Sequence, residues 1–445
     1  MSSKRFLIIA FSILVFCTFS YSTNIIIIAV DTLRADHLGC YGYPRNTSPN
    51  IDEFARNATQ FNNCYTPVPR TGPAFASMLS SLPPYKHGAK SNGLPIFDNI
   101  QLLPHFLKKY GYYSGAFVAI WTLKKKICGL DKGFDDYTEV FNRKMWFGVM
   151  SPEGKAPKVN EAAFEWLEQN SRKRFFLWVH YNEPHMPYKY HKKFDRGYNI
   201  VFPSFYPKGC SFRKIKKYDT EVGYVDFYIG ELIKKIKHLN LYEDSLIIFL
   251  ADHGEGFGEH NYYGHGQLLY NSTLHIPLIV KLPGNKNLHS VIERKVSLMD
   301  VAPTILSQLD YPVPEQMEGE NLFESSNKER VFYFETYKGS AQQEKNKMFQ
   351  IKETPLKYGL LKNNIKLIFK NKYKAYDLAE DKFELNNIYE NPDEEMKALS
   401  GLLEDYIKKI QEYIEFTEKY LKKKSQLSKE DLEKLRSLGY IKKRE

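Results

Sequence analysis

Four short runs made almost entirely of apolar residues mark predicted strands in the first two thirds of the chain. They span residues 24–30, 175–179, 245–251 and 276–280. Runs that are apolar at every position are typical of strands buried on both faces of a sheet. Between them lie stretches with apolar residues three or four apart, such as residues 219–237, which predict amphipathic helices. The alternation predicts an α/β fold with a large mixed, mostly parallel sheet and helices on both faces.

Three of these strands run directly into an ionisable residue. Asp31, His180 and Asp252 each follow the last apolar residue of a run. Because ligands of open α/β sheets bind beyond the carboxyl ends of the strands, these side chains predict a site at that edge. A single strand-end Asp is more often a helix cap, so the chemistry depends on further residues.

The last third of the chain has a different pattern. Residues 330–337 and 356–376 alternate in polarity and are interrupted by polar turns, as expected for antiparallel strands. After Pro392 the sequence is rich in Lys and Glu and predicts a helix. We therefore expect a smaller C-terminal α+β subdomain. The predicted organisation is a signal peptide at 1–22, a catalytic domain at 23–327, an antiparallel-sheet subdomain at 328–392 and a helical tail at 393–445.

The N-terminus predicts export. Lys4 and Arg5 precede a mostly apolar run at residues 6–19, and small residues around Ser22 offer a cleavage site. The run is shorter than the roughly 20 residues that span a membrane comfortably. We expect cleavage after Ser22 and a periplasmic or extracellular protein. A retained anchor at residues 6–19 is the alternative, and it alone would imply membrane contact.

Composition excludes several classes of protein. Hydrophobic residues make up 43% and charged residues 26% of the 445 positions, which excludes intrinsic disorder and collagen. The net charge of +11 is consistent with an anionic partner, or with lysines scattered over solvated helix faces. We find no nucleic-acid-binding motif and expect no nucleic-acid partner. The five cysteines form no CxxC pair, which excludes a zinc ribbon and leaves disulfide pairing open.

Three further segments carry residues suited to chemistry. Residues 71–88 begin with Thr71 and Pro73, which precede an apolar run. This pattern predicts a helix with Thr71 as its N-cap. A hydroxyl at that position lies at the positive end of the helix dipole. Residues 251–266 hold six Asp, Glu or His residues within fourteen positions, a density typical of metal and anion sites. Residues 180–188 hold two His residues, which suit anion binding or protonation of a leaving group, although such a pair is more often structural.

Together with residues 30–42, these segments resemble the sulfatase family of the alkaline-phosphatase superfamily, in the family's order. The resemblance extends over residues 24–441. It implies a divalent metal ion held at two strand ends and a nucleophile at a helix N-terminus. The matching positions are Asp31, Asp252, His253 and Thr71 for the metal, Thr71 for the nucleophile, and His180, His185 and His265 for the substrate anion or leaving group. Glu255, Glu259 and His260 match supporting positions only.

The sequence departs from the family at its nucleophile. Sulfatases carry a Cys or Ser that is oxidised to formylglycine, with Arg four residues later, whereas this chain has Thr71 and Phe75. A threonine ester cannot collapse to an aldehyde, so turnover requires a second attack at sulfur or phosphorus. Phosphoryl transfer proceeds readily in this way. The departure therefore favours a phosphoester over a sulfate ester as the substrate.

The metal ligands depart from the family as well. The family's Asp-Asp opening is Asp31-Thr32 here, and its Asp-Asn pair is Asp252-His253. An imidazole ligand favours zinc or manganese, although calcium stays an alternative. The resulting set resembles that of the Thr-dependent phosphoethanolamine and phosphoglycerol transferases.

The function expected from the sequence is therefore an exported, metal-dependent hydrolase of the sulfatase family. It would cleave an anionic ester, either a sulfate ester or a phosphoester, through Thr71, and the organic part would be a glycan or a lipid headgroup. One alternative is a phospho-group transferase acting on an envelope glycan or lipid. The other is a non-catalytic binding protein that keeps the fold.

Overall fold

The fold is built on one large sheet. A computed structural model describes residues 23–141, 154–196, 206–285, 289–324, 329–337 and 354–425. The sheet has eight strands, whose spatial order is β10 (Ser290–Ser297), β2 (Thr59–Tyr65), β9 (His275–Lys281), β6 (Ser245–Ala251), β1 (Asn24–Val30), β5 (Phe175–Tyr181), β3 (Tyr113–Val118) and β4 (Asp136–Glu139). Neighbouring strands are parallel except where β9 pairs with β2 and β6. The predicted mixed, mostly parallel sheet is confirmed.

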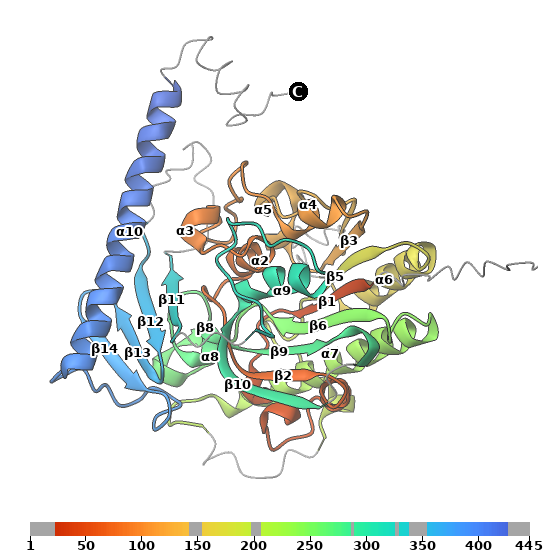
Figure 1. Cartoon of the computed structure of the whole chain (residues 1–445). Helices are drawn as coiled ribbons and strands as arrows, with labels where there is room; N and C mark the ends of the chain where they lie inside the picture. The colour runs from red at the N-terminus through yellow and green to blue at the C-terminus, as the bar shows by residue number, and fades with distance from the viewer. Residues whose placement is uncertain are drawn as a thin grey trace, which may run out of the picture.

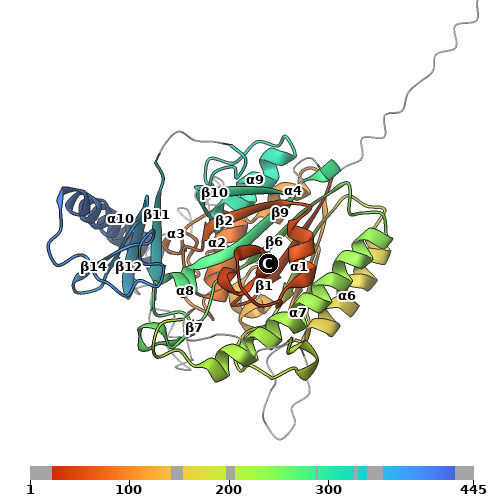
Figure 2. The same ribbon diagram turned by 90° about the horizontal axis from the view of Figure 1, so that it is seen from below.

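Helices cover both faces of this sheet (Figures 1 and 2). One face carries α1 (Pro49–Ala55), α6 (Ala156–Asn170) and α7 (Phe212–His238). The other carries α2 (Thr71–Ser80), α4 (Leu103–Lys108) and α9 (Val301–Gln308). Shorter helices are α3 (Pro84–His87), α5 (Lys125–Cys128) and α8 (Asn271–Leu274). The central strands are therefore buried on both sides, as their unbroken apolar runs predict.

A second, smaller sheet follows in the chain. Its antiparallel strands are β11 (Val331–Thr336), β12 (Lys357–Lys362), β13 (Ile365–Phe369) and β14 (Tyr373–Asp377). The long helix α10 (Glu394–Ser425) packs along β12 and β13 and runs beyond the sheet (Figure 1). A two-stranded ribbon of β7 (Gly256–Phe257) and β8 (Tyr263–Gly264) lies in the segment that follows β6. The predicted α+β character of the C-terminal part is confirmed.

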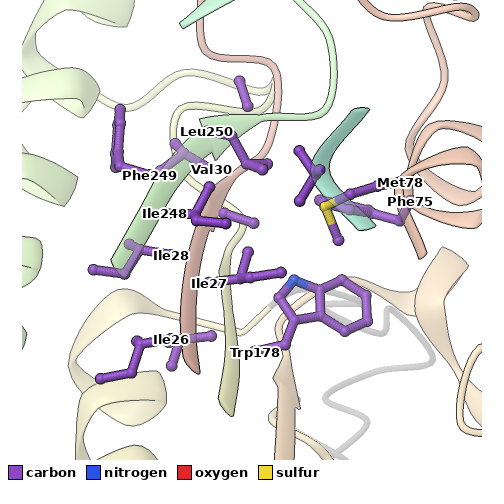
Figure 3. Packing of buried hydrophobic residues seen from close by; sticks show 14 of the residues in the cluster. Ile26, Ile27, Ile28, Val30, Phe75, Met78, Trp178, Ile248, Phe249 and Leu250 are labelled. Carbon is purple, nitrogen blue, oxygen red and sulfur yellow. The ribbon is translucent and has the colours of Figure 1, made fainter. Parts of the chain in front are cut away.

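Packing of α2 against the central strands fixes the start of that helix. Trp178 of β5 is fully buried, and its ring centroid lies 5.0 Å from that of Phe75 in α2 (Figure 3). All ten residues of α2 are buried. Burial of side chains of this size stabilises the fold by about 1.5–3 kcal/mol each. The first residue of α2, Thr71, is thereby held at the edge of the sheet.

Gly115 in β3 offers a test of the packing beneath α6. A Cβ at this position would lie 2.6 Å from Cε2 of Trp166, whose Nε1 donates a hydrogen bond to Asp136. Gly115→Ala should lower the free energy of unfolding by about 1–3 kcal/mol, because the anchored ring cannot move aside. Gly401→Ala in α10 is the control: its Cβ meets no heavy atom within 4 Å, and it should raise that free energy by about 0.4–1 kcal/mol. Denaturant titration measures both, and an unchanged Gly115→Ala would contradict this packing.

Two expectations concern the ends of the chain and its thiols. The predicted signal peptide, residues 1–22, lies outside the described residues. In the described part of the chain, no helix combines the length and the apolar composition needed to cross a membrane. Cys40, Cys64, Cys128 and Cys210 are all free thiols.

Candidate active site

The register of three parallel strands brings the first site residues together. Val30 of β1 pairs with Ala251 of β6, so Asp31 and Asp252 leave the sheet side by side at its carboxyl edge. On the other flank of β1, Ala29 pairs with His180 of β5. The predicted convergence at this edge follows from the pairing of β1 with both neighbours.

Asp31, Asp252 and His253 form a fully buried cluster. One ligand atom from each lies within 4.8 Å of the other two. His253 Nδ1 is 2.9 Å from the carbonyl oxygen of Gly254, which can only accept, so Nδ1 carries the proton and Nε2 carries the lone pair. Nε2 lies 3.4 Å from Asp252 Oδ2 and 3.3 Å from Thr71 Oγ1. The imidazole therefore presents a lone pair to the two carboxylates and the hydroxyl.

The chemistry of this cluster fits a divalent cation. Asp252 Oδ1 accepts the backbone N–H groups of Thr32 and His253, at 3.1 and 2.8 Å. Its Oδ2 receives no hydrogen bond from the described residues. Burial raises the pKa of Asp252 to about 7, which shows how poorly the protein alone stabilises the carboxylate. Carboxylate oxygens and an unprotonated imidazole are ligands for zinc and manganese.

Thr71 is the first residue of α2, and the predicted N-cap assignment is wrong by one residue. The N-cap position belongs to Arg70, whose backbone is extended. The Thr71 hydroxyl lies beside His253 instead of capping the helix. The side chain of Asn92 takes over this role by accepting the N–H of Gly72 at 3.0 Å. The Thr71 hydroxyl thus lies at the positive end of a helix, facing the carboxylate cluster.

His180 is locked as a hydrogen-bond donor. Its Nδ1 accepts the backbone N–H of Ala119 at 3.2 Å, so the proton of the neutral ring is on Nε2. Burial lowers the pKa of His180 to about 3, which keeps the ring neutral at physiological pH. Nε2 lies 3.6 Å from Asp31 Oδ2. His180 therefore directs an N–H toward the carboxylate cluster.

His185 and His265 complete the cluster. The His265 ring centroid lies 4.4 Å from that of His253 and 5.2 Å from that of His185. His265 Nδ1 lies 3.3 Å from Oε1 of the buried Glu255, a contact that orients the ring. His185 Nδ1 donates to the carbonyl of Met186 at 2.7 Å, and burial lowers its pKa to about 4. Contacts thus link every predicted site residue to the cluster, and a buried carboxylate orients His265 within it.

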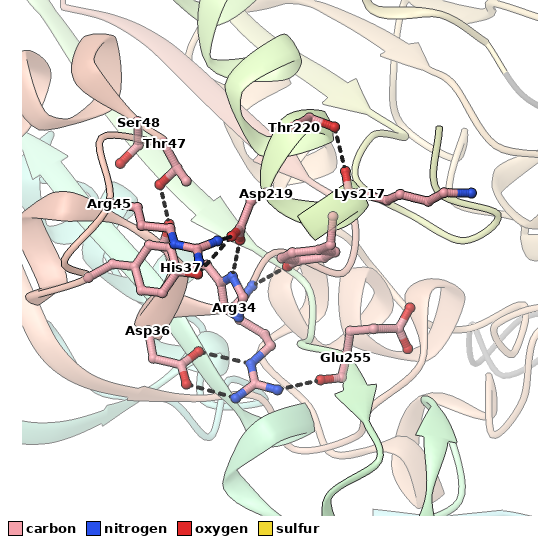
Figure 4. A network of polar contacts seen from close by, with 12 residues as sticks. Arg34, Asp36, His37, Arg45, Thr47, Ser48, Lys217, Asp219, Thr220 and Glu255 are labelled. Carbon is pink, nitrogen blue, oxygen red and sulfur yellow. Dashed lines mark hydrogen bonds and ion pairs between the residues drawn. The ribbon is translucent and has the colours of Figure 1, made fainter. Parts of the chain in front are cut away.

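A buried polar network centred on Arg34 holds the loop after β1, and the sequence predicted no role for this arginine. Arg34 donates to Glu259 at 2.7 Å and to the carbonyl of Glu255 at 3.0 Å, and it also binds Asp36 (Figure 4). Thr32 has a positive φ of 54°, which is strained for a β-branched residue. The Tyr218 hydroxyl donates to the Thr32 carbonyl at 2.7 Å and stabilises this conformation.

The three supporting positions expected from the resemblance have different surroundings. Glu255 contacts His265, and Glu259 contacts Arg34. His260 stacks instead on Tyr270, with ring centroids 3.5 Å apart. Position in the motif therefore indicates a supporting contact for the two carboxylates but not for His260.

Arg70 is a second residue whose role the sequence did not reveal. Its guanidinium is buried and donates to the carbonyl of Gly266 at 3.1 Å, to the carbonyl of Tyr337 at 3.0 Å and to Ser91 Oγ at 3.3 Å. Arg70 therefore ties the start of α2 to the segment that carries His265 and to the end of β11. The sequence offers one indication of this role, because Arg70 directly precedes the candidate nucleophile Thr71.

Arg70→Met should lower kcat by about 100-fold with little change in KM, because small displacements of aligned catalytic groups cost about this much. Arg174→Met is the matched control: Arg174 donates to the carbonyl of Tyr110 in the segment between α4 and β3, so its loss should affect stability and not kcat. Steady-state kinetics with thermal melting measures both. An Arg70→Met protein that melts earlier but keeps its kcat would show a purely structural role.

Two family models and a sulfatase of known source match this chain. The sequence model of the family described as "Sulfatase" matches residues 23–311, and the one described as "N-sulphoglucosamine sulphohydrolase, C-terminal" matches residues 258–413. The chain is 26% identical over 329 residues to the ulvan-active sulfatase of Formosa agariphila. That alignment covers 68% of this chain and 64% of the relative, so the chain spans less than two thirds of that protein.

Two solved structures have a similar fold. One is a protein in complex with its substrate D-glucosamine-2-N,6-O-disulfate, with a TM-score of 0.71, 19% identity, and coverage of 88% of this chain and 98% of that one. The other is the phosphonate monoester hydrolase of Agrobacterium radiobacter, with a TM-score of 0.67, 16% identity, and coverage of 88% and 95%. At these identities the likeness concerns the fold.

Proposed function

The chain belongs to the sulfatase family of the alkaline-phosphatase superfamily. From this membership we propose that it is an exported, metal-dependent hydrolase of anionic esters with Thr71 as its nucleophile. The proposal assigns catalysis to residues 23–327, with the smaller subdomain at 328–392 and the helical tail at 393–445. The substrate is an ester of sulfuric or phosphoric acid on a glycan or a lipid headgroup.

One observation carries the proposal. The Thr71 hydroxyl lies 3.3 Å from the unprotonated Nε2 of His253, beside the carboxylates of Asp31 and Asp252. A hydroxyl at a helix N-terminus, next to a cluster suited to a cation, is the arrangement that nucleophilic displacement at phosphorus or sulfur requires.

Asp31, Asp252, His253 and Thr71 would hold the metal ion, with zinc or manganese favoured over calcium because of the imidazole. When bound, such an ion lowers the pKa of an adjacent hydroxyl and offsets the negative charge of ester oxygens. His180 directs its Nε2–H toward Asp31 and so helps to orient that carboxylate.

The reaction proceeds in two displacements. Beside a bound cation the Thr71 hydroxyl would release its proton to solvent, and its Oγ then forms a bond to the phosphorus or sulfur atom while the bond to the leaving alcohol breaks. His265, oriented by Glu255, gives a proton to the departing oxygen. Water then attacks the same phosphorus or sulfur atom and gives one proton to His265, while the bond to Thr71 Oγ breaks and leaves the deprotonated oxygen with which the cycle began. His185, held neutral beside His265, is placed to contact the leaving group.

The residues favour a phosphoester over a sulfate ester. Phe75 stands where sulfatases carry an arginine, and Thr71 cannot become formylglycine. A phosphonate monoester hydrolase has a similar fold, so this fold is compatible with chemistry at phosphorus. A glycan as the organic part is supported by the ulvan-active relative and by the structure in complex with a glucosamine disulfate.

The test is a panel of p-nitrophenyl esters (sulfate, phosphate and a bis-phosphodiester), each assayed with zinc, manganese or calcium. We expect phosphoester hydrolysis with zinc or manganese. Calcium-dependent sulfate turnover would contradict the preference for phosphorus. A product that appears only after an alcohol acceptor is added would identify a transferase. A purified protein that neither contains nor takes up metal would favour the non-catalytic alternative.

A further inference from the structure

A buried carboxyl group joins the second sheet, helix α10 and the catalytic domain. Glu335 lies in β11 and is 1% exposed. The hydroxyl of Tyr406 in α10 donates to its Oε1 at 2.5 Å, and the hydroxyl of Tyr337 donates to its Oε2. Two hydroxyl donors, one at each oxygen, suit an ionised carboxylate, because a protonated one must donate through one of its oxygens. The proposed reaction uses neither this carboxyl nor the two hydroxyls.

Glu335 is the group of this cluster that titrates near neutrality. Burial raises the pKa of Glu335 to about 7, against the hydrogen bonds from the two hydroxyls and the positive charge of the buried Lys90. In the described part of the chain, Tyr85 of α3 and Tyr358 of β12 also face the carboxyl. Burial raises the pKa of these two tyrosines, and of the two that bind Glu335, above the usual value. The tyrosines stay neutral near pH 7, so the charge of the cluster changes there through Glu335.

The two residues that follow Glu335 hold the candidate active site. The hydroxyl of Thr336 donates to the carbonyl of Gly266 at 2.5 Å. The carbonyl of Tyr337 accepts a hydrogen bond from the guanidinium of Arg70 at 3.0 Å. Gly266 directly follows the histidine proposed to protonate the leaving group, and Arg70 directly precedes the nucleophile. The end of β11 is therefore connected to both sides of the reacting centre.

Aromatic packing fixes the tyrosine that α10 contributes to this cluster. Helix α10 packs against both the second sheet and α3 (Figure 1). The ring of Tyr406 stacks on that of Tyr333 in β11, with centroids 4.1 Å apart. Tyr85 of α3 meets the rings of Tyr406 and Tyr413 edge-on, at centroid distances of 5.9 and 5.4 Å. These rings set the position of the Tyr406 hydroxyl, so the C-terminal helix determines where the carboxylate of Glu335 is held.

We propose that Glu335 is a positioning residue of the hydrolase: its ionised carboxylate holds Tyr337 between α10 and Arg70, and so aligns the nucleophile. The inference rests on the proposed function, and it makes the C-terminal subdomain part of the catalytic unit. Protonation removes the charge to which both hydroxyls donate, and hydrogen bonds to a neutral carboxyl are weaker. The end of β11 then holds Arg70 less firmly, so kcat falls as the pH drops through neutrality.

Stability distinguishes this role from a purely structural one. The folded-state pKa of Glu335, about 7, lies above the ordinary value of 4.5, so the folded protein binds this proton more tightly than the unfolded chain. The ionised carboxyl therefore makes the fold less stable as the pH rises from about 4.5 to 7. Glu335→Gln removes this effect, so its melting temperature at pH 8 should equal or exceed that of the wild type. Its kcat at that pH should nevertheless be about tenfold lower, because the nucleophile is less well aligned.

The pH dependence of kcat tests the proposal. Zinc-loaded wild type and Glu335→Gln are assayed with the best p-nitrophenyl ester between about pH 5.5 and 8.5. Glutamine is neutral at every pH, so the ratio of the two kcat values isolates this carboxyl from the other titrating groups. We expect a ratio of about 1 at the acid end and about 10 at the alkaline end, with KM changed less than about threefold. A ratio that does not depend on pH would overturn the proposal.

Three further variants act on the same elements. Tyr406→Phe removes the donor to Oε1 of Glu335 and should lower kcat at pH 8 by about threefold or more. Asp300→Asn weakens the ion pair with Arg330 directly before β11, where the two side chains lie 2.6 Å apart. Tyr373→Phe removes a hydroxyl that donates to Glu404 of α10 at 3.0 Å. The last two are controls, which should melt earlier and keep the pH dependence of the wild type.

Amide hydrogen exchange tests the same coupling without turnover. At pH 8, peptides that cover residues 66–74 and 264–270 should exchange about threefold faster or more in zinc-loaded Glu335→Gln than in the wild type. They should exchange at the wild-type rate in Tyr373→Phe. Unchanged exchange in Glu335→Gln, or equally fast exchange in the control, would contradict the coupling. Faster exchange confined to Glu335→Gln in a protein without hydrolase activity would show that the proposed function fails while the connection from Glu335 to Arg70 holds.

Discussion

Replacing Thr71 with alanine should reduce kcat at least about 10⁴-fold, because removal of a nucleophile leaves only binding and electrostatic stabilisation. Thr71 is fully buried at the start of α2, and its hydroxyl makes one contact with His253 that the structure records. Loss of this contact should cost about 1 kcal/mol of stability, too little to unfold the protein. Rapid-quench or steady-state assays with the preferred p-nitrophenyl ester measure the effect, and thermal melting confirms the fold.

Two further variants decide what the loss means. Thr71→Ser keeps a hydroxyl and should retain a measurable part of the activity. Thr304→Ala removes another buried threonine hydroxyl. Thr304 lies in α9, and its hydroxyl oxygen accepts the N–H of Leu322, so this change should lower stability without changing kcat. Activity of Thr71→Ala within tenfold of the wild type would refute the nucleophile assignment.

Asp252→Asn should abolish metal-dependent activity. In the metal-free protein the same change should maintain or raise the stability at pH 7. Burial raises the folded-state pKa of Asp252 to about 7, above its value in the unfolded chain. The folded state therefore binds the proton more tightly, and this carboxyl makes the metal-free protein less stable as pH rises from about 4 to 7. The asparagine removes that dependence, so the metal-free variant should equal or exceed the wild type in stability at pH 7.

The same variant should lose the stabilisation that metal gives the wild type, about 2.7 kcal/mol at a metal concentration of 100 Kd. Melting curves with and without zinc or manganese, between pH 4 and 8, separate the two effects. Asp226→Asn is the matched control, since burial also raises the pKa of Asp226, to about 6, but its oxygens accept N–H groups at the start of α1. It should destabilise the protein and leave metal binding intact. An Asp252→Asn protein that still gains stability from metal would exclude Asp252 as a ligand.

The parts of the site that the sequence predicts are those fixed by strand geometry. Unbroken apolar runs predicted the central strands, and parallel pairing of β1 with β5 and β6 placed Asp31, His180 and Asp252 at one edge. The contact of Thr71 with His253 joins residues 182 positions apart. No local pattern contains that contact, so it came from the family resemblance alone.

Other features depended on details that a sequence does not carry. The N-cap of α2 lay one residue earlier than predicted, because the Thr71 hydroxyl lies beside His253 and Asn92 binds the free N–H of Gly72. The tautomers of the histidines follow from single backbone contacts. The positive φ of Thr32 and the contacts of Arg70 with the carbonyls of Gly266 and Tyr337 arise from packing between distant segments. Such groups have ordinary sequence surroundings and acquire a role only in the folded chain.

Trapping the covalent intermediate tests the central claim most directly. The metal-loaded wild type is mixed with the best p-nitrophenyl ester and quenched in acid during turnover, and its peptides are analysed by mass spectrometry beside those of Thr71→Ala. The account predicts one phosphoryl or sulfuryl group on the peptide that contains Thr71, and none on that peptide from the variant. Product formation with the group on another residue, or a burst of product with an unmodified Thr71 peptide, would contradict it.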